Sequence, residues 1–118
     1  LKDLCARLPY GVKVECKWKT PAPNGTYGMV CTLDSFLLDQ IYNVDDVDVP
    51  FDEFKPYLFP LSSMTEEQIK EFNSITQKCS TYIGKSILLT DFCNKHHIDW
   101  RGFIEKGLAL DATGKNVY

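Results

Sequence analysis

The residues best suited to chemistry lie in the last third of the chain, where a cysteine precedes two histidines. Cys93 and His96 are three residues apart on a segment predicted to be helical, a spacing that can place both side chains on one face. Together with His97, and with Asp91 or Cys79, they could supply four ligands to a zinc ion. The chain has no CxxC knuckle, and this spacing is not that of a known finger. Histidines at a helix end more often meet solvent or bond the last carbonyl groups.

The same side chains permit an enzymatic interpretation. A cysteine nucleophile needs a thiolate of low pKa within hydrogen-bond reach of an imidazole, together with backbone donors for an oxyanion. Cys93 and His96 could form the pair, but no glycine-rich turn follows them to supply those donors. A small metal-dependent or cysteine-histidine enzyme that uses Cys93, His96 and His97 is therefore the alternative hypothesis.

A run of acidic residues in the middle of the chain is a second candidate for chemistry. It has neither the turn glycine nor the final glutamate of an EF-hand calcium loop. Its charges could also imitate the phosphate spacing of DNA. Carboxylates this dense repel one another, which favours a solvated loop or sheet edge. The run comprises Asp45, Asp46, Asp48, Asp52 and Glu53.

Trp100 and Arg101 form the most plausible contact pair in the sequence. Tryptophan and arginine are enriched where protein interfaces concentrate their binding energy. If Trp100 packs into the core, which we favour, only Arg101 remains for contact with a partner. We assign no catalytic, cofactor-binding or metal-ligating residue from the sequence.

The first part of the chain is predicted to form one short helix and then strands. Leucines at helical spacing indicate a helix over 1–8, and alternation of apolar and charged residues indicates a strand over 12–19. Prolines and an Asn-Gly pair predict a hairpin loop at 20–25. Strands are then expected at 27–33 and, in uncertain register, at 35–44. Cys16 and Cys31 fall on the apolar faces of their strands, whereas Lys13, Lys17 and Lys19 share a face expected to meet water.

The second part is predicted to be mainly helical. Apolar residues at helical spacing indicate a short helix from Phe51 to Leu58 that ends at Pro60. Thr65 and Gln68 have the spacing of a capping box, which predicts the start of a helix that continues to Gly84. A second helix is expected within 87–97.

The end of the chain is predicted to hold one more short helix. Asp99 can cap this helix from Trp100 onward, and Gly107 can close it in the left-handed conformation. Residues 109–118 are expected to form a polar tail.

Composition limits the classes of function. The formal charge of −3 and the scattered basic residues disfavour nucleic-acid binding, which depends on clustered Lys and Arg. No segment approaches the roughly 20 apolar residues of a membrane helix, so we expect no membrane span. The 5 cysteines are an odd number without close pairs, which favours a reducing compartment such as the cytoplasm.

Three segments resemble a family of uncharacterised small proteins from gut Bacteroidetes and their phages or mobile elements. They are residues 8–14, 56–65 and 99–109, with sequences LPYGVKV, PYLFPLSSMT and DWRGFIEKGLA. The resemblance implies a bacterial cytoplasmic setting and a mobile-element origin. It implies no activity, ligand or catalytic residue.

The sequence as a whole predicts one α+β domain over 1–118. Its small antiparallel sheet would be a meander over residues 12 to about 44, with the later helices packed on one face. The favoured function is a non-enzymatic cytoplasmic interaction or accessory module with an unidentified protein partner. The surface it uses would lie near Trp100 and Arg101 or at the acidic run. The oligomeric state is not fixed by the sequence.

Overall fold

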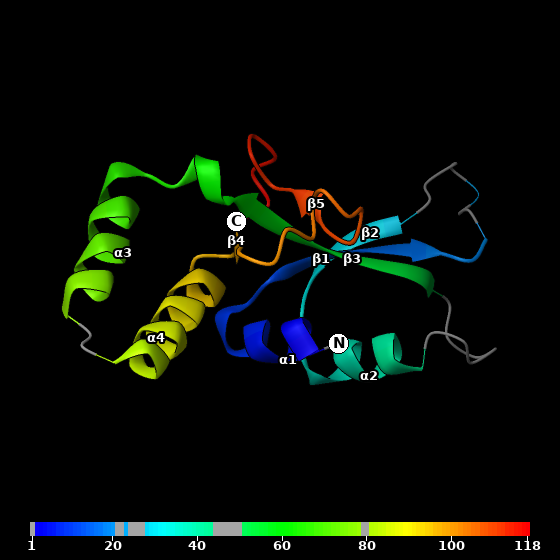
Figure 1. The fold of residues 1–118 in the computed structure, drawn as a ribbon. Helices are drawn as coiled ribbons and strands as arrows, with labels where there is room; N and C mark the ends of the chain where they lie inside the picture. Colours follow the sequence, from blue (N-terminus) through cyan, green and yellow to red (C-terminus); the bar gives the residue numbers. More distant parts are fainter. Residues whose placement is uncertain (1, 21–22, 24–27, 44–50, 79–80) are drawn as a thin grey trace.

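The computed structural model describes residues 2–20, 23, 28–43, 51–78 and 81–118 (Figure 1). Helices and a mixed, mostly antiparallel sheet follow one another along the chain, so the predicted α+β class is confirmed. The described helical segments are α1 (Lys2–Arg7), η1 (Leu8–Tyr10), α2 (Ser35–Tyr42), η2 (Leu61–Ser63), α3 (Glu66–Lys78) and α4 (Tyr82–Lys95). The described strands are β1 (Lys13–Trp18), β2 (Gly28–Thr32), β3 (Phe51–Pro60), β4 (Ile98–Asp99) and β5 (Leu110–Asp111).

The sheet begins with the predicted hairpin but does not continue as a meander. β1 pairs antiparallel with β2 on one side and with β3 on the other. β3 then pairs in parallel with the short strands β4 and β5. The third strand therefore comes after a helix, and the sheet is mixed. Most of the predicted hairpin loop at 20–25 lies outside the described residues.

Residues 35–44 were expected to form a strand, and this prediction was wrong. The segment forms α2, because Asp34 caps its start by accepting a hydrogen bond from the backbone NH of Leu37 at 2.7 Å. Leu37 is buried, while Leu38 and Ile41 lie against the same core at helical spacing. The cap and this spacing together favour the helix over a third strand.

The predicted helix from Phe51 to Leu58 was also wrong, since these residues belong to strand β3. Pairing with β1 places Phe54 opposite Cys16 and Lys55 opposite Glu15. The segment is rich in aromatic residues, which pack well on a pleated surface. Tertiary pairing therefore decides the conformation of a sequence whose apolar spacing is compatible with either structure.

The capping box at Thr65 is confirmed, but the helix that follows is shorter than predicted. The backbone NH of Gln68 donates to Thr65 Oγ1 at 3.2 Å, and the NH of Thr65 donates to Gln68 Oε1 at 3.0 Å. α3 ends at Lys78. α4 begins at Tyr82, because the side chain of Thr81 accepts a hydrogen bond from the NH of Gly84 at 3.1 Å. The predicted single helix to Gly84 and second helix within 87–97 are thus a helical hairpin.

Residues 100–108 form turns and no helix, which corrects the predicted last helix. Asp99 still caps these turns: its two carboxylate oxygens accept from the NH groups of Phe103 and Ile104 at 2.8 and 2.9 Å. Gly107 has the expected positive φ of 74°.

The predicted polar tail is integrated into the sheet instead. The hydroxyl of Tyr118 donates to the carbonyl of Tyr57 at 2.6 Å and accepts from the NH of Lys13 at 2.9 Å. It therefore bridges β1 and β3 beside the pair Val14 and Pro56.

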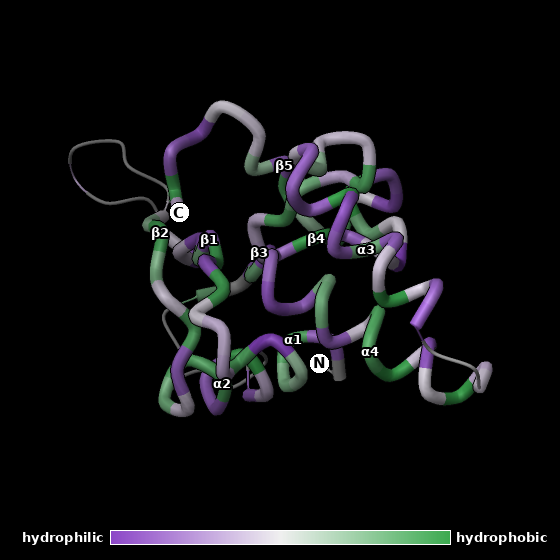
Figure 2. The backbone as a smooth tube through the Cα atoms, turned by 90° about the vertical axis from the view of Figure 1, so that its left-hand side faces the viewer, coloured by the Kyte–Doolittle hydropathy of each residue, from purple (hydrophilic) through white to green (hydrophobic). Residues whose placement is uncertain are grey.

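Two clusters of buried apolar residues organise the molecule. In the first, α1 and α2 lie against the sheet, and both are seen beneath it in Figures 1 and 2. Its fully buried members include Val12, Val14, Cys16 and Leu58. The second cluster joins the α3–α4 hairpin to β4 through Phe92, Cys93 and Ile98. The hairpin lies at one end of an elongated molecule of 54 × 27 × 22 Å (Figure 1).

A buried arginine fastens α1 to β4. Arg7 is 0% exposed; its Nε donates to Asp3 Oδ2 and its Nη2 to the carbonyl of Ile98, both at 2.8 Å. An ion pair in such a position stabilises the fold only while both partners are present, because either charge alone would be buried without compensation.

Candidate functional site

The structure does not assemble Cys93, His96 and His97 into a reactive group. No hydrogen bond joins any two of these three side chains. Burial raises the pKa of the Cys93 thiol, although the charge of Arg7 acts in the opposite direction, so the neutral thiol is favoured over the nucleophilic thiolate. Within the described ranges, no group of three or more His, Cys, Asp or Glu residues could hold a metal ion. Cys79 lies outside those ranges.

The two histidines instead have separate structural surroundings. The His96 ring lies 4.6 Å from that of Phe92, and its Nε2 is 3.8 Å from Glu71 Oε2 on α3. The His97 ring stacks on Tyr118 with 3.9 Å between ring centroids. Burial and the nearby positive charges of Arg7, His96 and Lys13 lower the pKa of His97 to about 4. His97 is therefore neutral near pH 7.

Trp100 is half-buried and packs against the second apolar cluster, in line with the interpretation of Trp100 as a core residue. Its indole NH donates to Asn94 Oδ1 at 3.1 Å. The guanidinium of Arg101 lies 4.4 Å from the centroid of the Trp100 ring, which is cation–π geometry. The pair is thus divided: Trp100 contributes to the core and Arg101 reaches the surface.

Of the acidic run, only Glu53 has a described side chain. Asp45, Asp46 and Asp48 lie outside the described residues, as does the side chain of Asp52. Glu53 is in β3, where Lys55 and Lys17 approach it at 3.0 and 3.3 Å and hold the pKa of its carboxyl below the ordinary value.

Contacts within β1 and with its neighbouring strands account for part of the lysine face. Lys17 contacts Glu15 as well as Glu53, and Lys13 donates to the Thr32 hydroxyl.

On the apolar side of β1, burial beside Cys31 raises the pKa of Cys16 to about 12, so its thiol stays protonated.

The most distinctive surface is one that the sequence analysis did not single out, the outer face of α4. Tyr82, Ile83 and Ile87 are 86%, 73% and 63% exposed, although their side chains are large and apolar. They border a groove of about 580 Å³ at the junction of α4 and α1. The rest of the groove is formed by smaller or polar side chains, namely Ala6, Ser86, Thr90, Asp91 and Asn94. We call these lining residues the α4 face.

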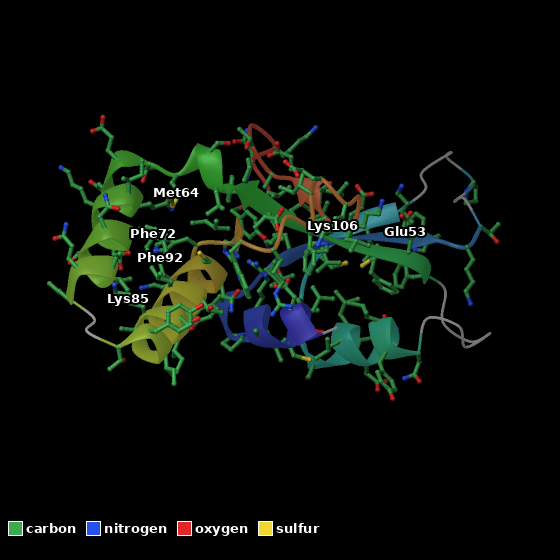
Figure 3. All side chains as sticks on the ribbon, in the orientation of Figure 1. Glu53, Met64, Phe72, Lys85, Phe92 and Lys106 are labelled. Carbon is green, nitrogen blue, oxygen red and sulfur yellow. The ribbon has the colours of Figure 1, made fainter. Side chains whose placement is uncertain are left out.

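The α3–α4 hairpin exposes this face because few side chains are buried between its two helices. Phe72 of α3 and Phe92 of α4 meet edge to face with 6.0 Å between centroids, and both are labelled in Figure 3. Phe92 is buried, but no described residue of α3 is buried. The first two turns of α4 therefore expose apolar side chains that α3 and α1 leave uncovered. The sequence of α4 could have indicated this face, because apolar residues fall on all sides of the helix and one neighbouring helix cannot cover them all.

No protein-family model, curated protein or solved structure matches this chain. Among the described residues, no helix is long and apolar enough to cross a membrane. The geometry of the α4 face thus carries the functional argument.

Proposed function

We propose that this chain is a non-enzymatic protein-interaction module that binds through its α4 face. The observation that carries the proposal is the exposure of Tyr82, Ile83 and Ile87 beside a groove. Contiguous exposed apolar side chains are uncommon on proteins that remain monomeric, and they mark interaction sites. A partner that covers them removes this apolar surface from water, which favours association.

The occupant of the face is a second copy of the chain, because the protruding side chains and all the lining residues of the groove except Ala6 come from the same helix, α4. The bulky side chains lie in the first two turns of α4, whereas Thr90 and Asn94 lie further along the groove. In an antiparallel pair with its two-fold axis between Ser86 and Ile87, Ile83 of one copy faces Thr90 of the other. A surface of this kind is self-complementary, as a two-fold symmetric interface requires.

The architecture of the hairpin supports the same arrangement. Two helices alone bury little surface, whereas two hairpins packed together form a four-helix bundle with a shared core. The hairpin lies at the end of the molecule remote from β2 and α2, so it can pair without interference from the sheet (Figure 1).

We further propose that the module works in a bacterial cytoplasm as an accessory protein of a phage or mobile element. The support for this setting is the resemblance of residues 8–14, 56–65 and 99–109 to such proteins.

Sedimentation equilibrium tests the proposal directly. Over a range from 1 to about 300 µM, the chain of 13.5 kDa should shift reversibly toward twice its mass as concentration rises. I83E should remain a monomer across the range, because the substitution places a charge in the paired interface. F36E is the matched control: Phe36 is 70% exposed on α2, away from the face, and this variant should dimerise as the unmodified chain does.

Circular dichroism should show the same helix content in both variants, which separates a loss of pairing from a loss of folding. A chain that stays monomeric at the highest concentration would overturn the proposed dimer. Equal loss of pairing in I83E and F36E would exclude the α4 face as its location.

A further inference from the structure

A second hollow, separate from the α4 face, lies between α1, α2, β3 and the turns after β4. Its volume is about 310 Å³, at the lower end of the range found for small-molecule sites. Its walls are mainly apolar and come from four different elements. The lining residues are Asp3, Leu4, Ile41, Phe54, Pro56, Arg101, Phe103 and Leu108.

The two charged residues that line this hollow, Asp3 and Arg101, make different contacts. Asp3 already has a partner in Arg7, whose Nε donates to its Oδ2 at 2.8 Å. Arg101 approaches the other oxygen, Oδ1, with its Nε at only 3.6 Å, and that nitrogen makes no hydrogen bond. Two guanidinium groups thus share one carboxylate. The nearby carboxylate of Asp99 is turned to the backbone NH groups of Phe103 and Ile104 and does not line the hollow.

Arg101 is held in place by stacking and by its long ion pair with Asp3, and its Nε makes no hydrogen bond. Its guanidinium lies over Trp100 at 4.4 Å and near Phe103 at 6.0 Å, and its side chain remains 31% exposed. It donates no hydrogen bond to any residue of the described chain. A planar guanidinium in this state is suited to a carboxylate, which can accept two parallel N–H bonds.

We propose that this hollow binds a small monocarboxylate with an aliphatic body, the carboxylate at Arg101 and the body against Leu4, Phe54 and Leu108. The apolar walls match the body, and the guanidinium of Arg101, whose Nε makes no hydrogen bond, matches the head. An ammonium head would be repelled by Arg101. A hydroxyl head could bury the same body but carries no charge of its own, so its hydrogen bond with the guanidinium would be weaker.

Titration with three eight-carbon probes, followed by ¹H–¹⁵N spectra, tests the assignment. Octanoate, octanol and octylamine share an aliphatic chain and differ in the head, and octanoate has about ten non-hydrogen atoms, a suitable size for a cavity of this volume. Octanoate should bind about tenfold more tightly than octanol, the difference expected for one charge-assisted hydrogen bond, and octylamine should bind least. The largest shifts should fall on residues 4, 54, 103 and 108.

R101M tests whether the preference for octanoate comes from Arg101 itself and not from the overall charge of the protein. The substitution keeps an unbranched apolar stem and removes the guanidinium. This variant should lose the preference and bind octanoate no more tightly than octanol. K106M is the control, because Lys106 is an exposed cation in the same turns that does not line the hollow (Figure 3). It should keep the tenfold preference. Equal affinity for the three probes, an unaltered preference in R101M, or shifts confined to the α4 face would each overturn the proposal.

Discussion

Two regions of the molecule differ in how completely they bury their apolar side chains. One is the sheet with its two covering helices, α1 and α2, and the other is the α3–α4 hairpin. In the first region, Val12, Val14 and Leu58 are fully removed from solvent, and a buried arginine joins α1 to β4. In the second, α3 has no buried residue in the described structure, while Ile83 and Ile87 of α4 face water. One region buries its apolar side chains within a single copy, whereas the other leaves apolar side chains in water, where the proposed second copy would cover them.

The polar groups and the exposed apolar groups of the two regions have different roles. Buried polar groups such as Arg7 and Asn94 hold elements together, and their hydrogen bonds run to the chain itself. The exposed features are apolar and lie on a regular helix, which suits recognition by packing.

The largest effect is expected for R7M in the region of the sheet. Removing the guanidinium leaves Asp3 with only its long contact to Arg101 and leaves the carbonyl of Ile98 without its donor. The free energy of unfolding should fall by about 3–5 kcal/mol, measured by urea denaturation. K95M, which removes an exposed cation from α4, should change it by less than about 0.5 kcal/mol. A similar small change in both variants would contradict the structural role of Arg7.

The next comparison matches two truncations of aliphatic side chains, one in each region. L58A opens a cavity in the core beneath the sheet and should cost about 2–5 kcal/mol. I87A removes a side chain that is 63% exposed and should cost less than about 0.5 kcal/mol when measured at a concentration where the chain is a monomer. Comparable losses would show that the α4 face is already covered within one copy.

A smaller effect is expected from pH, through His97. Its pKa of about 4 in the folded chain is below its ordinary value of 6.5, so protons bind the unfolded chain more readily. Stability should therefore be complete above pH 6.5 and decline as pH falls from 6.5 to 4. The loss attributable to His97 should be about 1–2 kcal/mol, since solvent screens a half-buried ring.

H97N isolates this contribution, because asparagine tolerates the positive φ of 59° at this position and does not titrate. Denaturation at pH 7 and pH 4.5 should show a smaller difference for H97N than for the unmodified chain. The same pH difference in both would assign the effect to other groups.

Local signals in the sequence predicted several elements correctly. The alternation over 12–19 gave β1, the capping box at Thr65 gave the start of α3, and Gly107 has the predicted positive φ. Each depends on residues close together in the chain. The α+β class followed from these elements.

Predictions that depended on distant partners failed. Residues 51–60 have helical apolar spacing, yet pairing with β1 makes them a strand, and residues 110–111 become a strand only because β3 lies beside them. The α4 face was missed for a related reason. A helix that is apolar on all sides is usually buried, and only the structure shows that its outer side is open. The spacing of Asp3 and Arg7, four residues apart, could have suggested their ion pair.

Amide hydrogen exchange at two protein concentrations tests the central claim most directly. If a second copy completes the hairpin, protection in α3 and α4 should rise between about 5 and 300 µM, because only the associated state covers the α4 face. In β1 and β3, protection should rise only as far as association increases the free energy of unfolding of the whole chain. Protection of α3 and α4 that is already as high as that of the sheet at 5 µM, and does not change with concentration, would contradict the account.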